Sequence, residues 1–574
     1  MTILLQRINL KNQLMPFLFA LLLAGCTNLF GNSFTNVLKN DANASSEYYI
    51  NQIQRTQNLE DQQTYKLLAA RVLVRENKIP QAQAMLAELN DLNEEQLLDK
   101  AIIEAHIAAV KGNNKAADSR LKAIDLALLS PSQKARYYEV VARVAKNRNQ
   151  IMNAVKARIQ IDSLLTDSQR KQENNDRTWA LLRNANRGLI NNTSAEGSAA
   201  LGGWLALAKA YNDNLNHPAQ LSQALQSWKA AYPRHSASYL FPTELQGLFN
   251  FQQTQLNQIA LLLPLSGDAQ IIGSTIKRGF DDARGNSDIQ VKVFDTLATP
   301  VENIIEQAKL EGINTIVGPL LKQNVDKLTN RPDLLQGLNV LTLNSTENSR
   351  AIGQLCYYGL APEDEAESAA NRIWDQGIQN PFIIVPQSDL GRRTASAFNT
   401  RWQQLSGTDA NIKFYNNADD ITYTLQSGLS QPIQALYIVA TNNQLSDIKL
   451  AIDNSNINLK LFASSRSNSS NNTPEYRLLM DGLEFSDIPF FKDVDSAQYK
   501  KVASVTNGDY SLMRLYAMGA DAWLLINQFN ELRQVPGFNI NGLTGKLSAG
   551  PNCNIEREMT WYQYQNASVV VLSN

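Results

Sequence analysis

The sequence predicts an α + α/β protein, in which an N-terminal helical solenoid precedes a two-lobed domain built on doubly wound parallel sheets. Two observations lead to this prediction. In the N-terminal half, apolar residues at helical spacing recur with a period of 35 residues. From about residue 257, short apolar runs alternate with amphipathic segments, as expected for buried strands between helices. The 574 residues suffice for several domains, and 44 % of them are hydrophobic.

The composition excludes several classes of function. Lys and Arg number 53 and Asp and Glu 54, so the chain has no basic footprint for nucleic acid. Three Cys and three His argue against a zinc framework. No histidine follows His235, so the C-terminal part cannot build a Ser-His-Asp or Cys-His site from its own residues. We therefore expect no metal, no cofactor and no nucleic-acid partner.

The N-terminus carries a targeting signal. Arg7 and Lys11 precede an apolar run, residues 14–23, which is too short for a bilayer span and fits a secretory signal. The run ends in Leu23-Ala24-Gly25-Cys26, which resembles the bacterial lipobox. This resemblance implies cleavage before Cys26 and its acylation, and the alternative is an ordinary signal peptide. Thr27 stands where an Asp would favour the inner membrane, so the resemblance implies outer-membrane sorting.

The residues after the signal predict a helical repeat array on a tether. Residues 27–46 are rich in Asn, Ser, Thr and Gly, which is typical of a flexible linker. Leu67, Ile102 and Tyr137 then occupy equivalent positions in three successive units. A polar turn follows each helix at the same phase, at residues 77–78, 112–113 and 147–148.

Later in this region, Trp204-x-x-Leu207-Ala208-x-x-Tyr211 resembles the tetratricopeptide (TPR) pattern. We predict a TPR-like solenoid with an irregular insert at about 166–198. Its concave surface would bind a protein segment, or the array would act only as a spacer.

The second half reads as two sets of alternating strands and helices. Apolar runs predict strands at residues 259–265, 289–294 and 315–320, and then again at 382–386, 435–440 and 460–463. Two such sets on one chain suggest two lobes with a cleft between them.

Three segments carry a resemblance to a known family: Ile259-Ala260-Leu261-Leu262-Leu263-Pro264-Leu265-Ser266-Gly267, Gly318-Pro319-Leu320 and Gly542-Leu543-Thr544-Gly545-Lys546-Leu547. They resemble type I periplasmic binding proteins. With the lipobox and the TPR-like repeats, the whole chain is similar to the outer-membrane lipoproteins that activate class A penicillin-binding proteins. The resemblance implies a non-enzymatic protein that docks on a peptidoglycan synthase and stimulates its transpeptidase activity.

The predicted organisation has four parts: a signal peptide at 1–25, a lipidated flexible tether at 26–46, a TPR-like domain at 47–248 and a type I periplasmic-binding-protein-like domain at 257–574.

The cleft residues follow from the strands. Ligands of open α/β folds bind beyond the carboxyl ends of the strands, where the candidates are Ser266, Gly267, Gly318, Pro319, Asn344, Ser345 and Ser388. In the resembled family the segment at 388–391 is Asp-x-Tyr-Gly, whereas Leu390 replaces the tyrosine here. This difference disfavours a small-molecule ligand and favours a fold reused for protein docking, although both hypotheses stay open.

Cys356 and Cys553 are the cysteines left after Cys26. An oxidising periplasm permits a disulfide between them, and two separate buried thiols are the alternative.

Enzymatic hypotheses find little support. Ser274-x-x-Lys277 and Ser446-x-x-Lys449 match one motif of penicillin-binding enzymes, but no Lys-Thr-Gly or Lys-Ser-Gly accompanies them. The sequence leaves three functions open: a non-enzymatic synthase activator, which we favour, a periplasmic solute-binding or sensing lipoprotein, and a peptidoglycan-cleaving or acyl-transfer enzyme.

Overall fold

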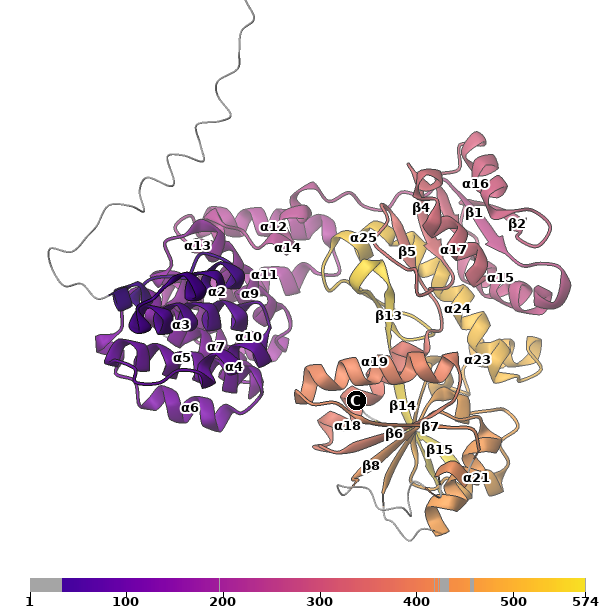
Figure 1. Ribbon diagram of the computed structural model, residues 1–574. Helices are drawn as coiled ribbons and strands as arrows, with labels where there is room; N and C mark the ends of the chain where they lie inside the picture. Colours follow the sequence, from indigo (N-terminus) through magenta and orange to yellow (C-terminus); the bar gives the residue numbers. More distant parts are fainter. Residues whose placement is uncertain are drawn as a thin grey trace, which may run out of the picture. The chain divides into compact units, whose positions relative to one another are not determined.

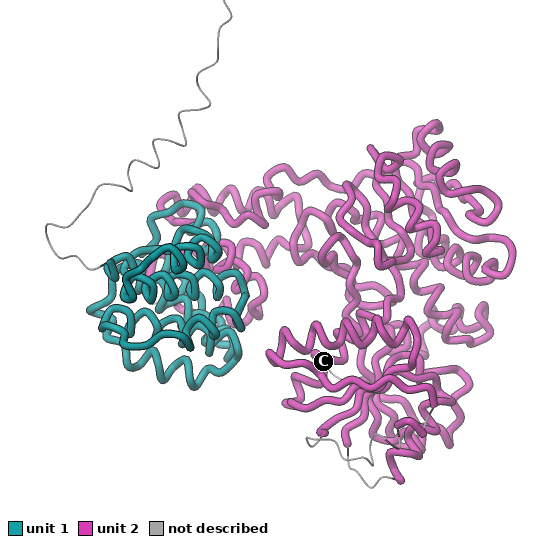
Figure 2. The backbone as a smooth tube through the Cα atoms, in the orientation of Figure 1, with its two compact units in different colours: residues 1–174 teal, residues 175–574 magenta. Residues whose placement is uncertain are grey.

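The computed structural model describes residues 34–572, except 196, 418, 422, 424–432 and 455–458. The chain divides into two compact units, residues 1–174 and 175–574 (Figure 2). Cys26 and the signal segment lie outside the described residues.

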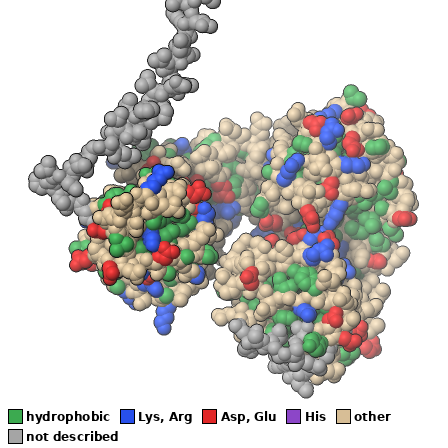
Figure 3. Space-filling view, viewed as in Figure 1, with side chains coloured by type: hydrophobic (Ala, Val, Ile, Leu, Met, Phe, Trp, Pro, Cys, Tyr) green, Lys and Arg blue, Asp and Glu red, His purple; other side chains and the backbone are tan. Residues whose placement is uncertain are grey.

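Among the described helices, none combines the length and hydrophobicity needed to cross a membrane. On the face shown in Figure 3, acidic and basic side chains are interspersed, as the near-zero net charge leads one to expect.

The first unit is an array of helix pairs, as predicted (Figure 1). Its elements are η1 (Phe34–Lys39), α2 (Ser46–Arg55), α3 (Leu59–Arg75), α4 (Ile79–Ala87), α5 (Glu94–Val110), α6 (Asn114–Lys122), η2 (Leu126–Leu128), α7 (Pro131–Asn147) and α8 (Ile151–Leu164). The repeat positions Leu67 and Ile102 are buried on α3 and α5. Each repeat therefore buries its apolar stripe against its neighbours, as stacking of small helix pairs requires.

The turns between paired helices explain the repeat length. Asn77, Gly112 and Asn149 end the first helix of successive pairs with φ of 59°, 75° and 56°. Asn and Gly are the residues that adopt this left-handed conformation most readily. The first interval is the predicted 35 residues, whereas the second is two residues longer and places the third left-handed residue at Asn149 instead of 147.

Part of the predicted flexible tether is an ordered element. Residues 34–39 form η1, and Leu38 is fully buried in the core of the first helices. Arg71 and Arg136 both donate to the Leu38 carbonyl, at 2.7 and 2.9 Å. Apolar burial and these bonds hold the segment in spite of its polar composition.

The predicted irregular insert is helical. It forms α9 (Ser168–Arg183), which spans the unit boundary, and α10 (Arg187–Asn192). Trp179 of α9 is 1 % exposed and meets the ring of Tyr211 edge-on. The polar composition of this segment led to the prediction of an irregular insert. One of its polar residues, Asn175, is nevertheless buried and donates to the Leu240 carbonyl at 2.9 Å. The helices continue with α11 (Ala199–Asn214), α12 (Pro218–Ala231), α13 (Ser236–Tyr239), α14 (Thr243–Gln246) and η3 (Gly247–Asn250).

The first lobe of the second unit contains a five-stranded parallel sheet of order β2-β1-β3-β4-β5. The strands are β1 (Gln258–Leu263), β2 (Gln290–Asp295), β3 (Thr315–Val317), β4 (Asn339–Thr342) and β5 (Leu355–Tyr357). The connections are η4 (Gly267–Ala269), α15 (Gln270–Arg284), α16 (Val301–Leu310), α17 (Lys322–Asn330) and η5 (Pro332–Leu335). Residues 259–263 are all fully buried, which explains the continuous apolar run.

The second lobe is built on a seven-stranded sheet of order β15-β14-β10-β9-β8-β6-β7. The strands are β6 (Pro381–Pro386), β7 (Asn411–Tyr415), β8 (Ala435–Ile438), β9 (Lys460–Ala463), β10 (Glu484–Asp487), β14 (Thr560–Gln565) and β15 (Ser568–Val571). Helices α18 (Pro362–Asp375) and α19 (Asp389–Ser406) pack on one face, and α21 (Asn442–Asn454) on the other (Figure 1). Other helices that the structure describes are η6 (Ser465–Ser467), α22 (Pro474–Leu479), η7 (Pro489–Lys492) and α23 (Ala497–Val505).

The two-lobed α/β prediction is confirmed, with one difference in strand direction. Strand β14 of the second sheet runs antiparallel to both of its neighbours, β10 and β15. A third, antiparallel sheet consists of β11 (Asn539–Asn541), β12 (Lys546–Ala549) and β13 (Ile555–Glu558). The chain also contains α24 (Tyr510–Asn527), α25 (Phe529–Gln534) and η8 (Pro551–Cys553).

Candidate functional site: a polar cavity in the second lobe

Six of the seven predicted cleft residues lie at the carboxyl edge of the first sheet, where their polar groups serve the fold. Asn344 donates from Nδ2 to the Leu320 carbonyl at 3.0 Å. Gly318, with φ 103°, approaches β1 so closely that a Cβ would lie 2.2 Å from the Leu262 oxygen. None of these residues lines the cavity described below. The rest of the group is Ser266, Gly267, Pro319 and Ser345.

Ser388, the seventh, follows β6 in the second lobe. Its Oγ accepts from the backbone N–H of Gly391 at 3.2 Å and caps the N-terminus of α19. The segment that departs from the family pattern is thus a helix start. Leu390, the residue that replaces the tyrosine, lines the cavity described next.

A cavity of about 200 Å³ lies at the carboxyl edge of the second sheet. Its walls come from the ends of three neighbouring parallel strands: Tyr437 on β8, Ser464 after β9 and Asp487 at the end of β10. Helices α18, α19 and α24 complete the enclosure, because they contribute Glu365, Thr394 and Arg514. Parallel strands bring their carboxyl ends to one edge, so residues far apart in sequence meet here.

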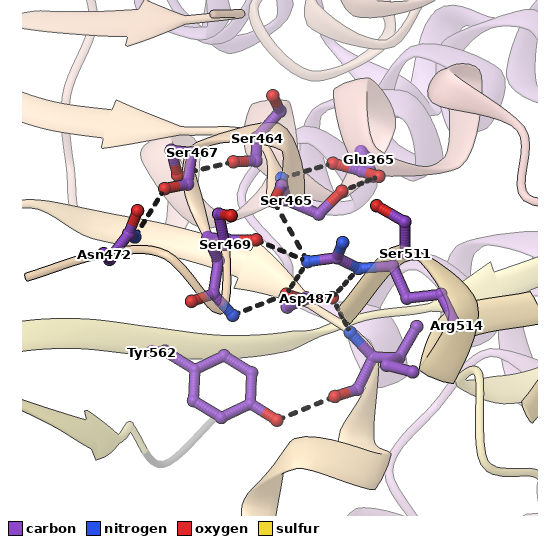
Figure 4. A network of polar contacts seen from close by, with 12 residues as sticks. Glu365, Ser464, Ser465, Ser467, Ser469, Asn472, Asp487, Ser511, Arg514 and Tyr562 are labelled. Atoms are coloured by element: carbon purple, nitrogen blue, oxygen red, sulfur yellow. Dashed lines mark hydrogen bonds and ion pairs between the residues drawn. The ribbon is translucent and has the colours of Figure 1, made fainter. Parts of the chain in front are cut away.

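Arg514 and Asp487 form the central ion pair of the cavity (Figure 4). The Arg514 guanidinium contacts both Asp487 carboxylate oxygens, with Nε at 3.0 Å and Nη2 at 2.6 Å. Asn468 adds a hydrogen bond from Nδ2 to the same carboxylate at 2.8 Å. Burial opposes the charge of Arg514, but Asp487 outweighs it and the pKa of Arg514 is raised.

Two carboxyl groups lie at the start of α18: Glu365 lines the cavity, and Asp364 pairs with Arg557, which also lines it. Glu365 accepts from the N–H and Oγ of Ser465, at 2.8 and 2.7 Å. Desolvation raises the pKa of Glu365 against these bonds. Asp364 pairs with Arg557 at 2.8 Å, and burial nonetheless raises the pKa of Asp364 to about 7. Both carboxyl groups are therefore held by protein donors, Asp364 by an arginine and Glu365 by a serine.

Cys356, on β5, and Cys553, in η8, are joined in a disulfide across a sequence separation of 197 residues. The bond ties the edge of the first sheet to the segment that precedes β13. Cys26 lies among the residues that the structure does not describe.

The Ser-x-x-Lys motifs lie on helices and form local contacts. Lys277 pairs with Asp281, and Lys449 with Asp453, one turn further on in each case. Ser446 Oγ donates to the Asn442 carbonyl of its own helix. Within the described residues no group of three or more His, Cys, Asp and Glu is placed to hold a metal ion.

The sequence analysis missed the residues that form the cavity. Ser464 and Ser465 directly follow the predicted strand at 460–463, so the strand-end rule could have found them. Arg514 carries no such signal, because α24 arrives from a distant part of the chain.

Comparisons with known proteins place the chain in a family. The family model described as "LppC putative lipoprotein" matches residues 39–567. A protein of Pasteurella multocida named "Penicillin-binding protein activator LpoA" is 69 % identical over 573 residues, which cover 100 % of both chains.

Two solved structures from Haemophilus influenzae are similar to the chain. The crystal structure of full-length LpoA shares 61 % identity and a TM-score of 0.79, covering 94 % of this chain and 100 % of that one. A C-domain structure, described as that of a regulator of PBP1A, shares 59 % identity and a TM-score of 0.54, covering 55 % of this chain and 100 % of that one.

Proposed function

The chain belongs to the LppC lipoprotein family, and from that premise we propose that it activates a class A bifunctional penicillin-binding protein. In this proposal it stimulates the synthase's transpeptidase activity in peptidoglycan synthesis and catalyses nothing itself. The observation that carries the proposal is the 69 % identity, over the full length of both chains, to a protein named as such an activator.

Anchoring to the outer membrane is part of the proposal. Acyl chains on Cys26 would hold the mature protein at the membrane, and Thr27 fits sorting to the outer membrane. Several acyl chains give a stable anchor where one would be reversible. Because η1 begins at Phe34, only residues 26–33 separate the anchor from the helical array.

We assign the adaptor two functional domains, residues 47–248 and 257–574. The helix pairs continue to α12, η3 ends at Asn250, and the first sheet begins at Gln258, which supports a boundary in the intervening segment. The TPR-like domain would present a surface for a protein segment, in keeping with stacked helix pairs generally.

The test is a reconstitution with the mature protein and a purified class A synthase. We expect a rise in the crosslinked fraction of newly made peptidoglycan, and no release of soluble products when the protein alone is incubated with sacculi. A synthase of another class provides the control. Unchanged crosslinking, or turnover of sacculi by the protein alone, would overturn the proposal.

A further inference from the structure

The cavity of the second lobe contains two buried hydroxyls without a partner. Tyr437 is fully buried and Ser464 is 4 % exposed, and both line the cavity. Neither Tyr437 Oη nor Ser464 Oγ has a hydrogen-bond partner in the structure. An unsatisfied buried hydroxyl is destabilising, so native proteins rarely keep one without a use. Both hydroxyls can donate to a molecule placed in the cavity.

A cationic side chain that lines the same cavity, Arg466, is also available to a ligand. Arg466 lies in η6, directly after Ser464 and Ser465, and its side chain is exposed. In the part of the chain that the structure describes, its guanidinium forms no hydrogen bond or ion pair. Because a guanidinium offers five donors and no acceptor, it favours an anionic group.

The acidic residues of the wall, in contrast, are occupied by protein donors. Asp487 accepts from Arg514, from Asn468 and from the Ile488 N–H. Glu365 accepts from the N–H and Oγ of Ser465. The cavity therefore offers a carboxylate two unpaired hydroxyl donors and a guanidinium. An ammonium group would instead compete with protein donors for Asp487 and Glu365.

The wall also has an apolar part, although Thr394, Ser465 and Arg557 line the cavity as well. Leu390, Val439, Ile488 and Met559 line the cavity together with Leu360. At about 200 Å³, the space is smaller than the usual range for drug-sized ligands, roughly 300–1,000 Å³. It suits a carboxylate head on a short hydrocarbon body.

We propose that this cavity is a binding site for a compact carboxylate that carries a short apolar body and no ammonium group. The carboxylate accepts from Arg466, Tyr437 Oη and Ser464 Oγ, and the hydrocarbon contacts Leu390 and Met559. This inference goes beyond activation of a synthase and holds or fails without it.

The test uses three probes with one carbon skeleton on the mature full-length protein. They are 4-methylpentanoate, its neutral amide 4-methylpentanamide, and L-leucine, which adds only the ammonium group. Thermal unfolding and calorimetric titration are measured in a buffer free of carboxylate. A ligand that binds only the folded state raises the melting temperature in proportion to its affinity. We expect 4-methylpentanoate at about 10 mM to stabilise the protein, and the amide and L-leucine to bind at least about tenfold more weakly.

Two variants locate the site. Tyr437→Phe removes a hydroxyl that has no partner, so the unliganded protein should keep its melting temperature while affinity for 4-methylpentanoate falls about fivefold. Arg466→Gln, at an exposed position, should lower that affinity about tenfold or more. Arg392→Gln is the matched control, since Arg392 is also exposed and does not line the cavity.

The proposal is overturned if 4-methylpentanoate leaves the melting temperature unchanged, or if L-leucine binds as tightly as the carboxylate. Unaltered affinity in both Tyr437→Phe and Arg466→Gln would also overturn it. Because no synthase is present in these measurements, their failure leaves the activator function untouched, and a failed reconstitution leaves this site untouched.

Discussion

At Asp99, one buried carboxylate holds two arginines from neighbouring helices. Asp99 is fully buried on α5, and its Oδ1 lies 2.5 Å from Arg71 of α3 and 3.1 Å from Arg136 of α7. Burial and the proximity of Arg71 lower the pKa of Arg136 to about 10, which still leaves it charged at neutral pH. The same arginines bond the Leu38 carbonyl, so Asp99 indirectly fixes the segment around Leu38.

Asp99→Asn should therefore destabilise the first unit by about 3 kcal/mol, because it leaves buried guanidinium groups without a counter-charge. The measurement is backbone hydrogen exchange in α3 and α5, which should accelerate about a hundredfold. Asp118→Asn is the control, since the Asp118–Arg148 pair is exposed and such pairs contribute less than about 1 kcal/mol. Equal exchange rates in the two variants would contradict the prediction.

Asp521 is a second buried carboxylate, on α24, and it explains the Gly542-Leu543-Thr544 motif. It accepts from the N–H groups of Leu543 and Thr544, both at 2.7 Å, and a Cβ at Gly542 would lie 2.5 Å from its Oδ2. Burial outweighs these bonds and raises the pKa of Asp521 to about 6. Tyr358 and Arg557 also face this carboxylate.

The raised pKa of Asp521 makes the stability of the fold depend on pH in a defined direction. The folded protein holds this proton more tightly than the unfolded chain, whose aspartates have a pKa near 3.8. Asp521 thus stabilises the fold most below about pH 4, and about 3 kcal/mol of that contribution is lost as pH rises to about 6. In urea titrations over this range, Asp521→Asn should show a shallower fall in stability than the wild type. Asp268→Asn, at an exposed position, should keep the wild-type slope.

At the level of elements, two glycines allow α15 and α24 to touch. A Cβ at Gly279 of α15 would lie 1.9 Å from the Tyr516 oxygen, and one at Gly519 of α24 would lie 1.9 Å from the Ile276 oxygen. Figure 1 shows the two helices side by side. The atoms in the way belong to the backbone and cannot rotate aside.

Gly279→Ala should consequently push the helices apart and cost about 2–4 kcal/mol, in the range of severe overpacking. The melting temperature of the mature protein measures this. Gly247→Ala is matched to it, because φ is −64° there and nothing lies within 4 Å of the added Cβ. That control should be neutral or slightly stabilising; a comparable loss in both variants would show that the close approach is unimportant.

For the whole molecule, the proposed anchor gives the most direct prediction. Cys26→Ala should abolish acylation, so the protein should leave the membrane fraction and the acyl mass on its N-terminal peptide should disappear. Membrane fractionation and mass spectrometry measure the two effects. Cys356→Ala is the control, because it removes a cysteine of the folded part and should leave the acyl mass in place. An unmodified Cys26 in the wild type would refute the anchor.

The sequence by itself determined what depends on local periodicity. The spacing of Leu67 and Ile102 gave the helix pairs, and continuous apolar runs such as 259–263 gave strands buried on both faces, because burial imposes these patterns residue by residue. The tertiary structure alone decided the cavity, the packing of residues 34–42 and the antiparallel course of β14. Arg514 reaches Asp487 across 27 residues and Arg557 reaches Asp364 across 193. Contacts of this kind arise from the meeting of distant elements in space, and no local pattern in the chain records them.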